Sequence, residues 1–229
     1  MKRRLSVFLI LVVVMSLSLL SACGKNQSAN NPAPADTDGE ADTRVIQHEM
    51  GETTISGTPE RVVVLEFSFV DALASLGITP VGIADDGDSE RIIGPIAEQI
   101  GEYTSVGTRK EPSLEMIASL NPDLIIADLQ RHKDAYEDLK EIAPTIVLSS
   151  LSANYEQNKA SLPVIAEALG KTEEAEQRIA EHEQLINELK STVPEDESRT
   201  VLPAVVTDTG FYAHSSASYT GSLLESIGL

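Results

Sequence analysis

The sequence has one cysteine, no tryptophan and few basic residues, and each shortage excludes a class of protein. One cysteine cannot form a disulfide framework within the chain, a Cys-x-x-Cys redox motif or a zinc site of four thiolates. Lysine and arginine number 17 against 36 aspartates and glutamates, which gives a formal charge of -19. Because such a surface repels phosphate backbones, we expect no nucleic-acid partner.

Motifs of common enzymes are also missing. The chain has no glycine-rich phosphate-binding loop, no Gly-x-Ser-x-Gly nucleophile elbow and no His-Glu-x-x-His zinc motif, so we expect no enzyme and no cofactor. Its four histidines are scattered and give weak support for a site that binds a metal ion directly. The composition is nevertheless that of a folded protein, because 41% of the 229 residues are hydrophobic and 23% are charged.

The N-terminus has the pattern of an export signal. Basic residues 2–4 precede an apolar run at residues 5–20, which is shorter than the ~20 residues of a membrane-spanning helix. The following Leu-Ser-Ala-Cys at residues 20–23 resembles the lipobox of bacterial lipoproteins. We therefore predict a signal peptide at residues 1–22 and lipid attachment at Cys23; the alternative is a buried or chance cysteine.

The next segment has little that can fold. Residues 24–44 contain no isoleucine, leucine, valine or aromatic residue, and are rich in asparagine, alanine, aspartate and proline. We predict that residues 23–44 are a flexible tether, anchored by lipid to the extracytoplasmic face of the cell membrane.

Short apolar runs alternate with helical patterns in residues 45–150, after a predicted hairpin at residues 45–55. Predicted strands cover residues 61–65, 80–84, 103–106, 123–127 and 145–148, and predicted helices cover residues 67–76, 113–120 and 132–142. This alternation predicts an α/β lobe whose parallel sheet is covered on both faces.

The pattern changes after residue 150. Residues 151–193 have helical spacing without a strand-like run and predict a helical connector. Residues 194–229 predict one strand, at 200–207, and one helix, at 219–227. A weak repeat relates residues 73–78 to residues 224–229, and only the first copy is followed by the rest of a lobe. We therefore expect a complete first lobe and a truncated second lobe.

Several motifs in order are similar to those of substrate-binding proteins of iron-siderophore and cobalamin ABC importers. They stand at residues 59–65, 77–83, 112–115 and 121–126. Motifs at residues 66–72, 106–109 and 131–133 resemble the ferric-citrate-type branch. The resemblance implies a two-lobed α/β metal-chelate-binding fold with a helical backbone. It also implies a monomer that binds a ferric siderophore or ferric citrate in the cleft between the lobes. This monomer would deliver the chelate to ABC permease subunits.

A ferric chelate with carboxylate or hydroxamate arms needs cationic donors that do not strip the iron. Arginine suits this purpose because its guanidinium stays charged and gives paired hydrogen bonds to a carboxylate. Arg91, Arg109 and Arg131 each follow a predicted strand, and ligands of open parallel sheets bind at the carboxyl ends of strands. We predict that all three face one cleft; for each alone, a solvated or salt-bridged arginine is the alternative.

Three further aromatic positions and one acidic position complete the candidates. Phe67 directly follows a strand, where a cleft wall is expected, although packing of a helix on a sheet is the commoner use. Tyr212 and Tyr219 follow the strand of the second lobe and are predicted on the opposite wall. Glu115 lies at a helix start, where the helix dipole favours a carboxylate, and the resemblance implies that it docks on the permease.

Other functions stay open at this point. A protein of the same fold can bind cobalamin, haem or a metal ion directly. A ligand-free surface lipoprotein explains the lipobox and the acidity, but not the arginines at the strand ends.

Overall fold

The computed structural model describes residues 43–229. Within that part, no helix is both long enough and apolar enough to cross a membrane. The predicted signal peptide and Cys23 lie outside the described residues, as does nearly all of the predicted tether.

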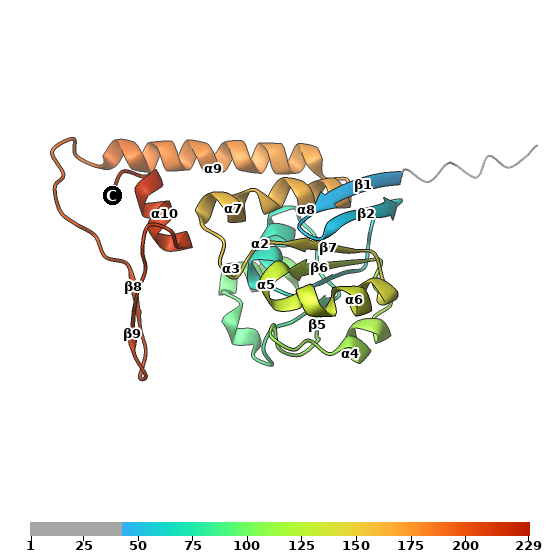
Figure 1. The fold of residues 1–229 in the computed structure, drawn as a ribbon. Helices are drawn as coiled ribbons and strands as arrows, with labels where there is room; N and C mark the ends of the chain where they lie inside the picture. Colours follow the sequence, from blue (N-terminus) through green and yellow to red (C-terminus); the bar gives the residue numbers. More distant parts are fainter. Residues whose placement is uncertain (1–42) are drawn as a thin grey trace, which may run out of the picture. The chain divides into compact units, whose positions relative to one another are not determined.

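The centre of the fold is a parallel sheet of five strands (Figure 1). Its order is β5-β4-β3-β6-β7, from β3 (Val62–Val64), β4 (Gly82–Ile83), β5 (Thr104–Ser105), β6 (Leu124–Asp128) and β7 (Thr145–Leu148). β3 lies in the middle, where Val63 pairs with Gly82 on one side and with Ile125 on the other. The predicted α/β fold with a parallel sheet is confirmed. Strands β3, β4, β6 and β7 are buried because helices cover both faces, whereas the edge strand β5 is partly exposed.

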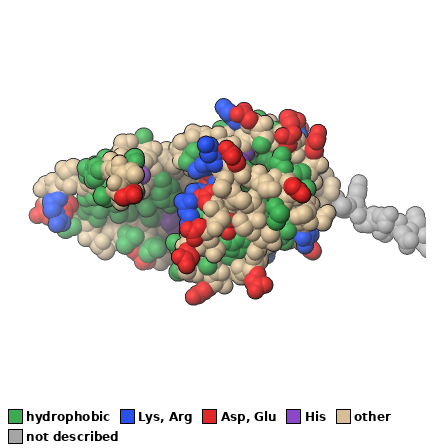
Figure 2. Space-filling model, turned by 90° about the horizontal axis from the view of Figure 1, so that it is seen from below, with side chains coloured by type: hydrophobic (Ala, Val, Ile, Leu, Met, Phe, Trp, Pro, Cys, Tyr) green, Lys and Arg blue, Asp and Glu red, His purple; other side chains and the backbone are tan. Residues whose placement is uncertain are grey.

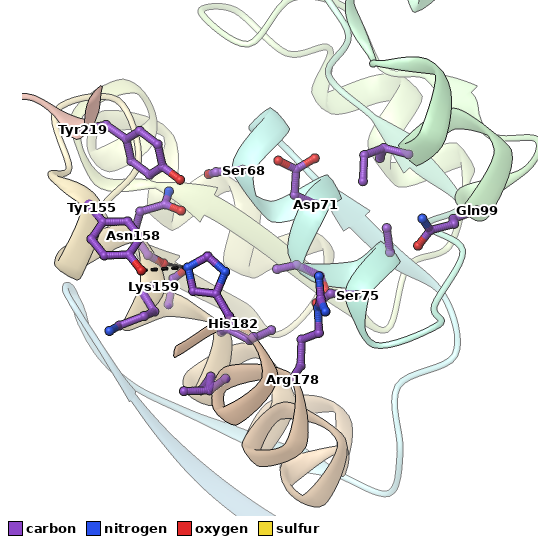
Figure 3. Close-up of a pocket in the computed structure, with 16 residues that line it drawn as sticks. Ser68, Asp71, Ser75, Gln99, Tyr155, Asn158, Lys159, Arg178, His182 and Tyr219 are labelled. Atoms are coloured by element: carbon purple, nitrogen blue, oxygen red, sulfur yellow. Dashed lines mark hydrogen bonds between the residues drawn. The ribbon is translucent and has the colours of Figure 1, made fainter. Parts of the chain in front are cut away.

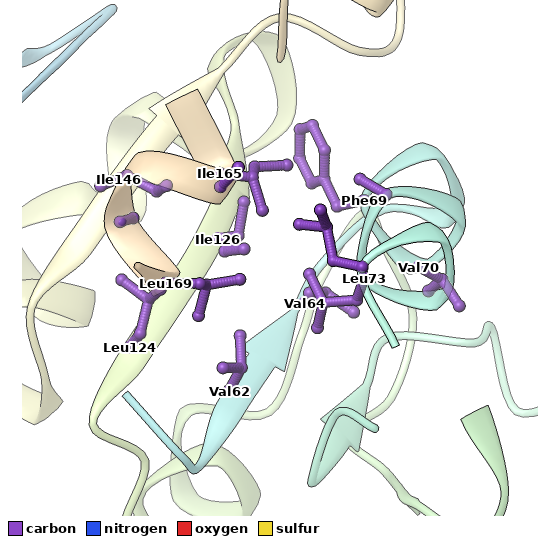
Figure 4. Packing of buried hydrophobic residues seen from close by; sticks show 14 of the residues in the cluster. Val62, Val64, Phe69, Val70, Leu73, Leu124, Ile126, Ile146, Ile165 and Leu169 are labelled. Carbon is purple, nitrogen blue, oxygen red and sulfur yellow. The ribbon is translucent and has the colours of Figure 1, made fainter. Parts of the chain in front are cut away.

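Alternate residues of one strand enter two separate cores. Val62 and Val64 pack with Phe69 and Leu73 of α2 (Phe67–Ser75) and with Ile165 of α8 (Ser161–Leu169), as Figure 4 shows. The intervening side chains, with α4 (Leu114–Ser119) and α6 (Tyr136–Ile142), form the core on the other face. Each large apolar side chain buried in this way stabilises the fold by about 1.5–3 kcal/mol.

Two helical regions differ from the prediction. The single helix predicted at residues 132–142 is wrong in its extent, because α5 (Leu129–His132), a 3₁₀ turn at Lys133–Ala135 and α6 follow one another there. The buried ring of His132 fixes that break, since its two nitrogens bond to backbone groups of other segments. A 3₁₀ turn at Ser89–Arg91 and α3 (Gly94–Ile100) were not predicted.

The hairpin predicted at residues 45–55 is confirmed. β1 (Thr43–His48) pairs antiparallel with β2 (Gly51–Ser56) and buries Ile46 and Ile55 against the main core. The hydroxyl of Thr53 donates to the carbonyl of Thr145 at 2.7 Å, which ties the hairpin to β7.

Three helices occupy the predicted connector, residues 151–193. They are α7 (Tyr155–Lys159), α8 and α9 (Thr172–Thr192). α8 packs in the core of the sheet and ends at Gly170, whose φ of +66° suits a residue without a side chain. α9 has Ala175 as its one buried residue, so its solvated face is consistent with its acidic sequence.

The last segment contains β8 (Ala204–Val206), β9 (Phe211–Ala213) and α10 (Tyr219–Ser226). The predicted helix is confirmed, whereas the predicted strand is shorter than residues 200–207 and pairs antiparallel with β9, which was not predicted. All residues of β8 and β9 are exposed. The domain boundaries and the truncated second lobe stay predictions.

Candidate functional site

Charged side chains follow four neighbouring strands of the sheet at their C-terminal ends. Glu66 follows β3, Asp86 follows β4, Arg109 follows β5, and Arg131 lies on α5 directly after β6. Parallel strands bring these positions to one edge, where ion pairs connect them. Figure 2 shows a face on which basic side chains gather beside a hollow, with acidic side chains around them.

Glu66 is the buried centre of this cluster, with 3% of its surface exposed. It forms an ion pair through Oε1 with Nε of Arg131, while Nη1 of Arg109 donates to its Oε2 at 3.4 Å. One carboxylate therefore holds two arginines. Burial raises the pKa of Glu66, and the charges of Arg131 and Arg109 act in the opposite direction.

Asp86 forms ion pairs with Arg109 and Arg91. It accepts hydrogen bonds from Nε of Arg109 at 3.0 Å, from Nη2 at 2.7 Å and from the backbone N–H of Arg109 at 2.8 Å. Arg91 forms a further ion pair with it. Hydrogen bonding to Arg109 lowers the pKa of Asp86. The φ of Asp86 is 63°, a left-handed conformation that aspartate tolerates better than most residues.

Phe67 lies beneath two of the arginines. The guanidinium carbon of Arg109 is 4.3 Å from the centroid of its ring, and that of Arg91 is 5.4 Å away. These distances are typical of cation-π contacts, which hold a guanidinium plane over a ring face. Phe69, by contrast, is fully buried in the core. Phe67 thus lies beside the arginines, whereas Phe69 packs α2 on the sheet.

His132 was missed as a site residue. Its Nδ1 accepts the N–H of Asp128 at 2.9 Å, so Nε2 carries the proton and donates to the carbonyl of Arg109 at 2.7 Å. Burial lowers the pKa of His132, which favours this neutral form. The ring therefore fixes the backbone of Arg109 to the end of β6. A histidine one residue after Arg131 was the available signal.

Asp128 joins the same network from the end of β6. Its side chain accepts hydrogen bonds from the backbone N–H groups of Arg131, Ser150 and Leu151 at 2.9–3.1 Å. The first of these bonds caps α5 and sets the direction in which Arg131 leaves the sheet.

The predicted tyrosines lie apart from the arginines in the contacts of the described residues. Tyr212 is an exposed residue of β9, and Tyr219 begins α10 with its ring 6.0 Å from that of Tyr155. Tyr219 also lines a hollow of about 670 Å³, where side chains from α2, α3 and α7–α10 meet (Figure 3). In this hollow the hydroxyl of Tyr155 and Nε2 of His182 are 2.7 Å apart.

Glu115 and the histidines complete the comparison with the predicted residues. Glu115 is exposed in the first turn of α4, which Ser113 caps by accepting the N–H of Met116 at 3.2 Å. Across residues 43–229, no group of three or more His, Cys, Asp and Glu residues is arranged to hold a metal ion.

Comparisons with known proteins agree with this fold. The family model described as "Periplasmic binding protein" matches residues 62–229. The chain is 48% identical to the Fe(3+)-citrate-binding protein YfmC of Bacillus subtilis, over 95% of the chain and 70% of YfmC. It is 41% identical to the Fe(3+) dicitrate-binding periplasmic protein FecB of Escherichia coli, over 80% of the chain and 61% of FecB.

Solved structures give the same picture. Staphylococcus aureus SirA complexed with staphyloferrin B matches with a TM-score of 0.72 at 27% identity, over 82% of this chain and 64% of that one. The petrobactin-binding protein YclQ of Bacillus subtilis matches with a TM-score of 0.69 at 25% identity, over 82% and 66%. The chain therefore spans about two-thirds of the length of these relatives.

Proposed function

The chain belongs to the periplasmic binding protein family, and from this premise we propose that it is the substrate-binding protein of an ABC importer for a ferric chelate with carboxylate arms. The relatives that it matches are binding proteins rather than enzymes, and they take the chelate as a ligand rather than as a cofactor. The convergence of Arg91, Arg109 and Arg131 at one edge of the sheet carries the proposal.

The chemistry of the cluster supports an anionic ligand. Arg131 uses Nε toward Glu66, and its terminal nitrogens form no hydrogen bond with residues 43–229. Its two NH₂ groups are thus available to a carboxylate in the paired geometry that arginine prefers. Arg109 is held on two sides by Asp86 and Glu66 and over Phe67, so it loses little side-chain entropy on binding.

Ferric citrate is the chelate that the relatives favour. The names of YfmC and FecB state that they bind it, and both proteins are more than 40% identical to this chain. A titration of the chain with ferric citrate, ferric hydroxamates, ferric catecholates, cobalamin, haem and Zn²⁺ tests the assignment. We expect saturable heat in calorimetry with ferric citrate; preferential binding of any other compound contradicts the choice of ligand.

We also propose that the protein is anchored by lipid at Cys23 and that Glu115 docks on the permease. A relative that is 40% identical, YhfQ, is named a putative ABC transporter substrate-binding lipoprotein. Cys23→Ala removes the one thiol of the chain, so we expect neither lipidation nor processing at that site. Metabolic labelling with a radioactive fatty acid checks this, and labelled, processed mutant protein contradicts it.

A further inference from the structure

Glu66 occupies an unusual position for a carboxylate in a site for anions. It is buried directly beneath the two arginines that we assign to the ligand, and both of its oxygens face them. Its Oε1 and the Nε of Arg131 are both fully buried and in contact with each other. The negative charge of Glu66 therefore depends on the two arginines that pair with it.

The charged neighbours of Glu66 come from the C-terminal ends of β5 and β6. Arg109 approaches from the segment after β5, and Arg131 approaches from α5. The carboxylate of Asp128, at the end of β6, acts on Glu66 with the same sign of charge. The remaining charged or titratable groups of the cluster act through the two arginines: Asp86, Arg91 and His132.

We propose that Glu66 adjusts this site to the charge of its ligand: it is a carboxylate in the empty protein and takes up a proton from solvent when an anionic chelate binds to Arg109 and Arg131. This inference rests on the proposed function. It makes Glu66 a residue that determines specificity, since its protonation lets the site accept more negative charge than the unprotonated cluster accepts.

Electrostatics determines the direction of the proton transfer. The positive charges of the two guanidiniums keep Glu66 ionised. A ligand carboxylate that binds to them compensates these positive charges, and it also adds a negative charge near Glu66. Burial already raises the pKa of Glu66, so the lost compensation raises it further. Asp86 responds less, because it is more exposed than Glu66 and its pKa is lowered by Arg109. The protonated carboxyl keeps an oxygen that can accept from Arg131.

Linkage then predicts how affinity depends on pH. Glu66 has one pKa in the free protein and a higher one in the complex. If binding takes up about one proton, affinity rises by up to about tenfold for each pH unit that is lowered between these two pKa values. The alternative is a fixed anchor: Glu66 stays charged throughout and only positions the arginines. That role predicts no proton uptake.

Infrared difference spectra separate the two roles. The chain is labelled with ¹³C at its glutamates and mixed with unlabelled ferric citrate, so carboxyl bands of the protein are distinguished from those of the ligand. We expect binding to produce the C=O band of a protonated, labelled carboxyl. The band should disappear in Glu66→Gln and in Glu66→Asp, and persist in Glu98→Gln, which removes an exposed carboxylate of α3.

Calorimetry of the unmodified chain in buffers of different ionisation enthalpy provides a test without any variant. We expect the heat of ferric citrate binding to change with the buffer in the direction of net proton uptake, after the proton exchange of ferric citrate itself is subtracted. Binding without uptake, or a labelled band that persists in both Glu66 variants, overturns this inference alone. Failure of every anionic chelate to bind overturns the proposed function together with it.

Discussion

The three arginines of the site differ in how firmly they are held and in what they offer a ligand. Arg91 is the most exposed, with 45% of its side chain accessible against 17% for Arg109 and 18% for Arg131. Arg109 combines ion pairs to two carboxylates with a contact to Phe67. Arg131 has more N–H groups left for a ligand than Arg109, so the three should contribute unequally.

Replacing these arginines tests that ranking. We expect Arg131→Ala and Arg109→Ala each to weaken ferric citrate binding by about tenfold to a hundredfold, since each removes a charge-assisted bond of about 1.5–3 kcal/mol. Arg91→Ala should have a smaller effect because solvent screens its charge. Arg199→Ala, at an exposed arginine paired with Glu197, removes the same charge elsewhere and is the control. Wild-type affinity in both of the first two variants contradicts the assignment.

The buried ring of His132 predicts a pH dependence of stability. Its pKa is lowered from 6.5 by burial, so below pH 6.5 the unfolded chain binds more protons than the folded one. The stability from the neutral ring is present above 6.5 and is lost as pH falls through that value toward the lowered pKa. His48 has a lowered pKa and contributes over the same range. We expect His132→Gln to reduce the slope of unfolding free energy against pH, measured by urea denaturation; an unchanged slope contradicts the prediction.

The sequence predicted the arginines of the cluster but not their partners. Position after a strand was enough to expect Arg91, Arg109 and Arg131 at one edge, because parallel strands share a direction. The pairing with Glu66 and Asp86 depends on loop conformation, in particular on the left-handed backbone at Asp86, and no local pattern specifies that. The ligand roles of these residues stay predictions.

At the scale of elements, β4 shows how closely the central strands pack. Gly82 lies between β3 and β5, and a Cβ placed there would be 2.6 Å from Cδ1 of Leu120, 3.0 Å from Cγ1 of Val106 and 3.2 Å from Cγ2 of Val63. Leucine can rotate away, whereas the two valines are restricted at χ1. A glycine in a strand interior therefore marks close packing rather than weakness.

Substitution of this glycine should destabilise the lobe. We expect Gly82→Ala to lower the free energy of unfolding by about 1–3 kcal/mol, the usual cost of overpacking a core. Gly94→Ala, in the first turn of α3 with no atom within 4 Å of the added methyl group, is the matched control and should be neutral or slightly stabilising. Urea denaturation of both variants checks this; equal midpoints contradict it.

Strands were easier to predict than the helices around them. Strands β3, β4, β6 and β7 are fully buried, so the apolar composition of these runs was a direct signal, whereas the edge strand β5 is partly exposed. The ring of His132, at the break, bonds to Asp128 four residues earlier and to Arg109 in the segment after β5, and no local pattern specifies the second bond. By contrast, composition separates the two longer helices of the connector: α8 is mostly apolar and packs Ile165 and Leu169 in the core, whereas the acidic α9 is solvated.

Across the described molecule, burial is uneven. Val62, Val63 and Val64 are fully buried and pair with strands on both sides. The ribbon of β8 and β9 has two strands and no buried residue, and Val206 is 74% exposed. A two-stranded hairpin without a packed face is marginal in water, because it gains little from burial to offset the entropy of ordering.

This contrast predicts two levels of protection against hydrogen exchange. We expect amide protons of Val205 and Val206 to exchange through local opening at nearly the rates of an unfolded chain, while those of Val63 and Val64 exchange only through near-global unfolding. In the antiparallel ribbon the N–H of Val205 faces β9, whereas that of Val206 faces away from it. The comparison of Val205 with Val63 and Val64 therefore isolates burial and the number of neighbouring strands from hydrogen bonding itself. Hydrogen exchange followed by mass spectrometry, with peptides covering β3 and β8, measures both rates at once. Equal protection of the two strands would mean that β8 and β9 are covered in solution by contacts other than those of residues 43–229, and the prediction would then be wrong.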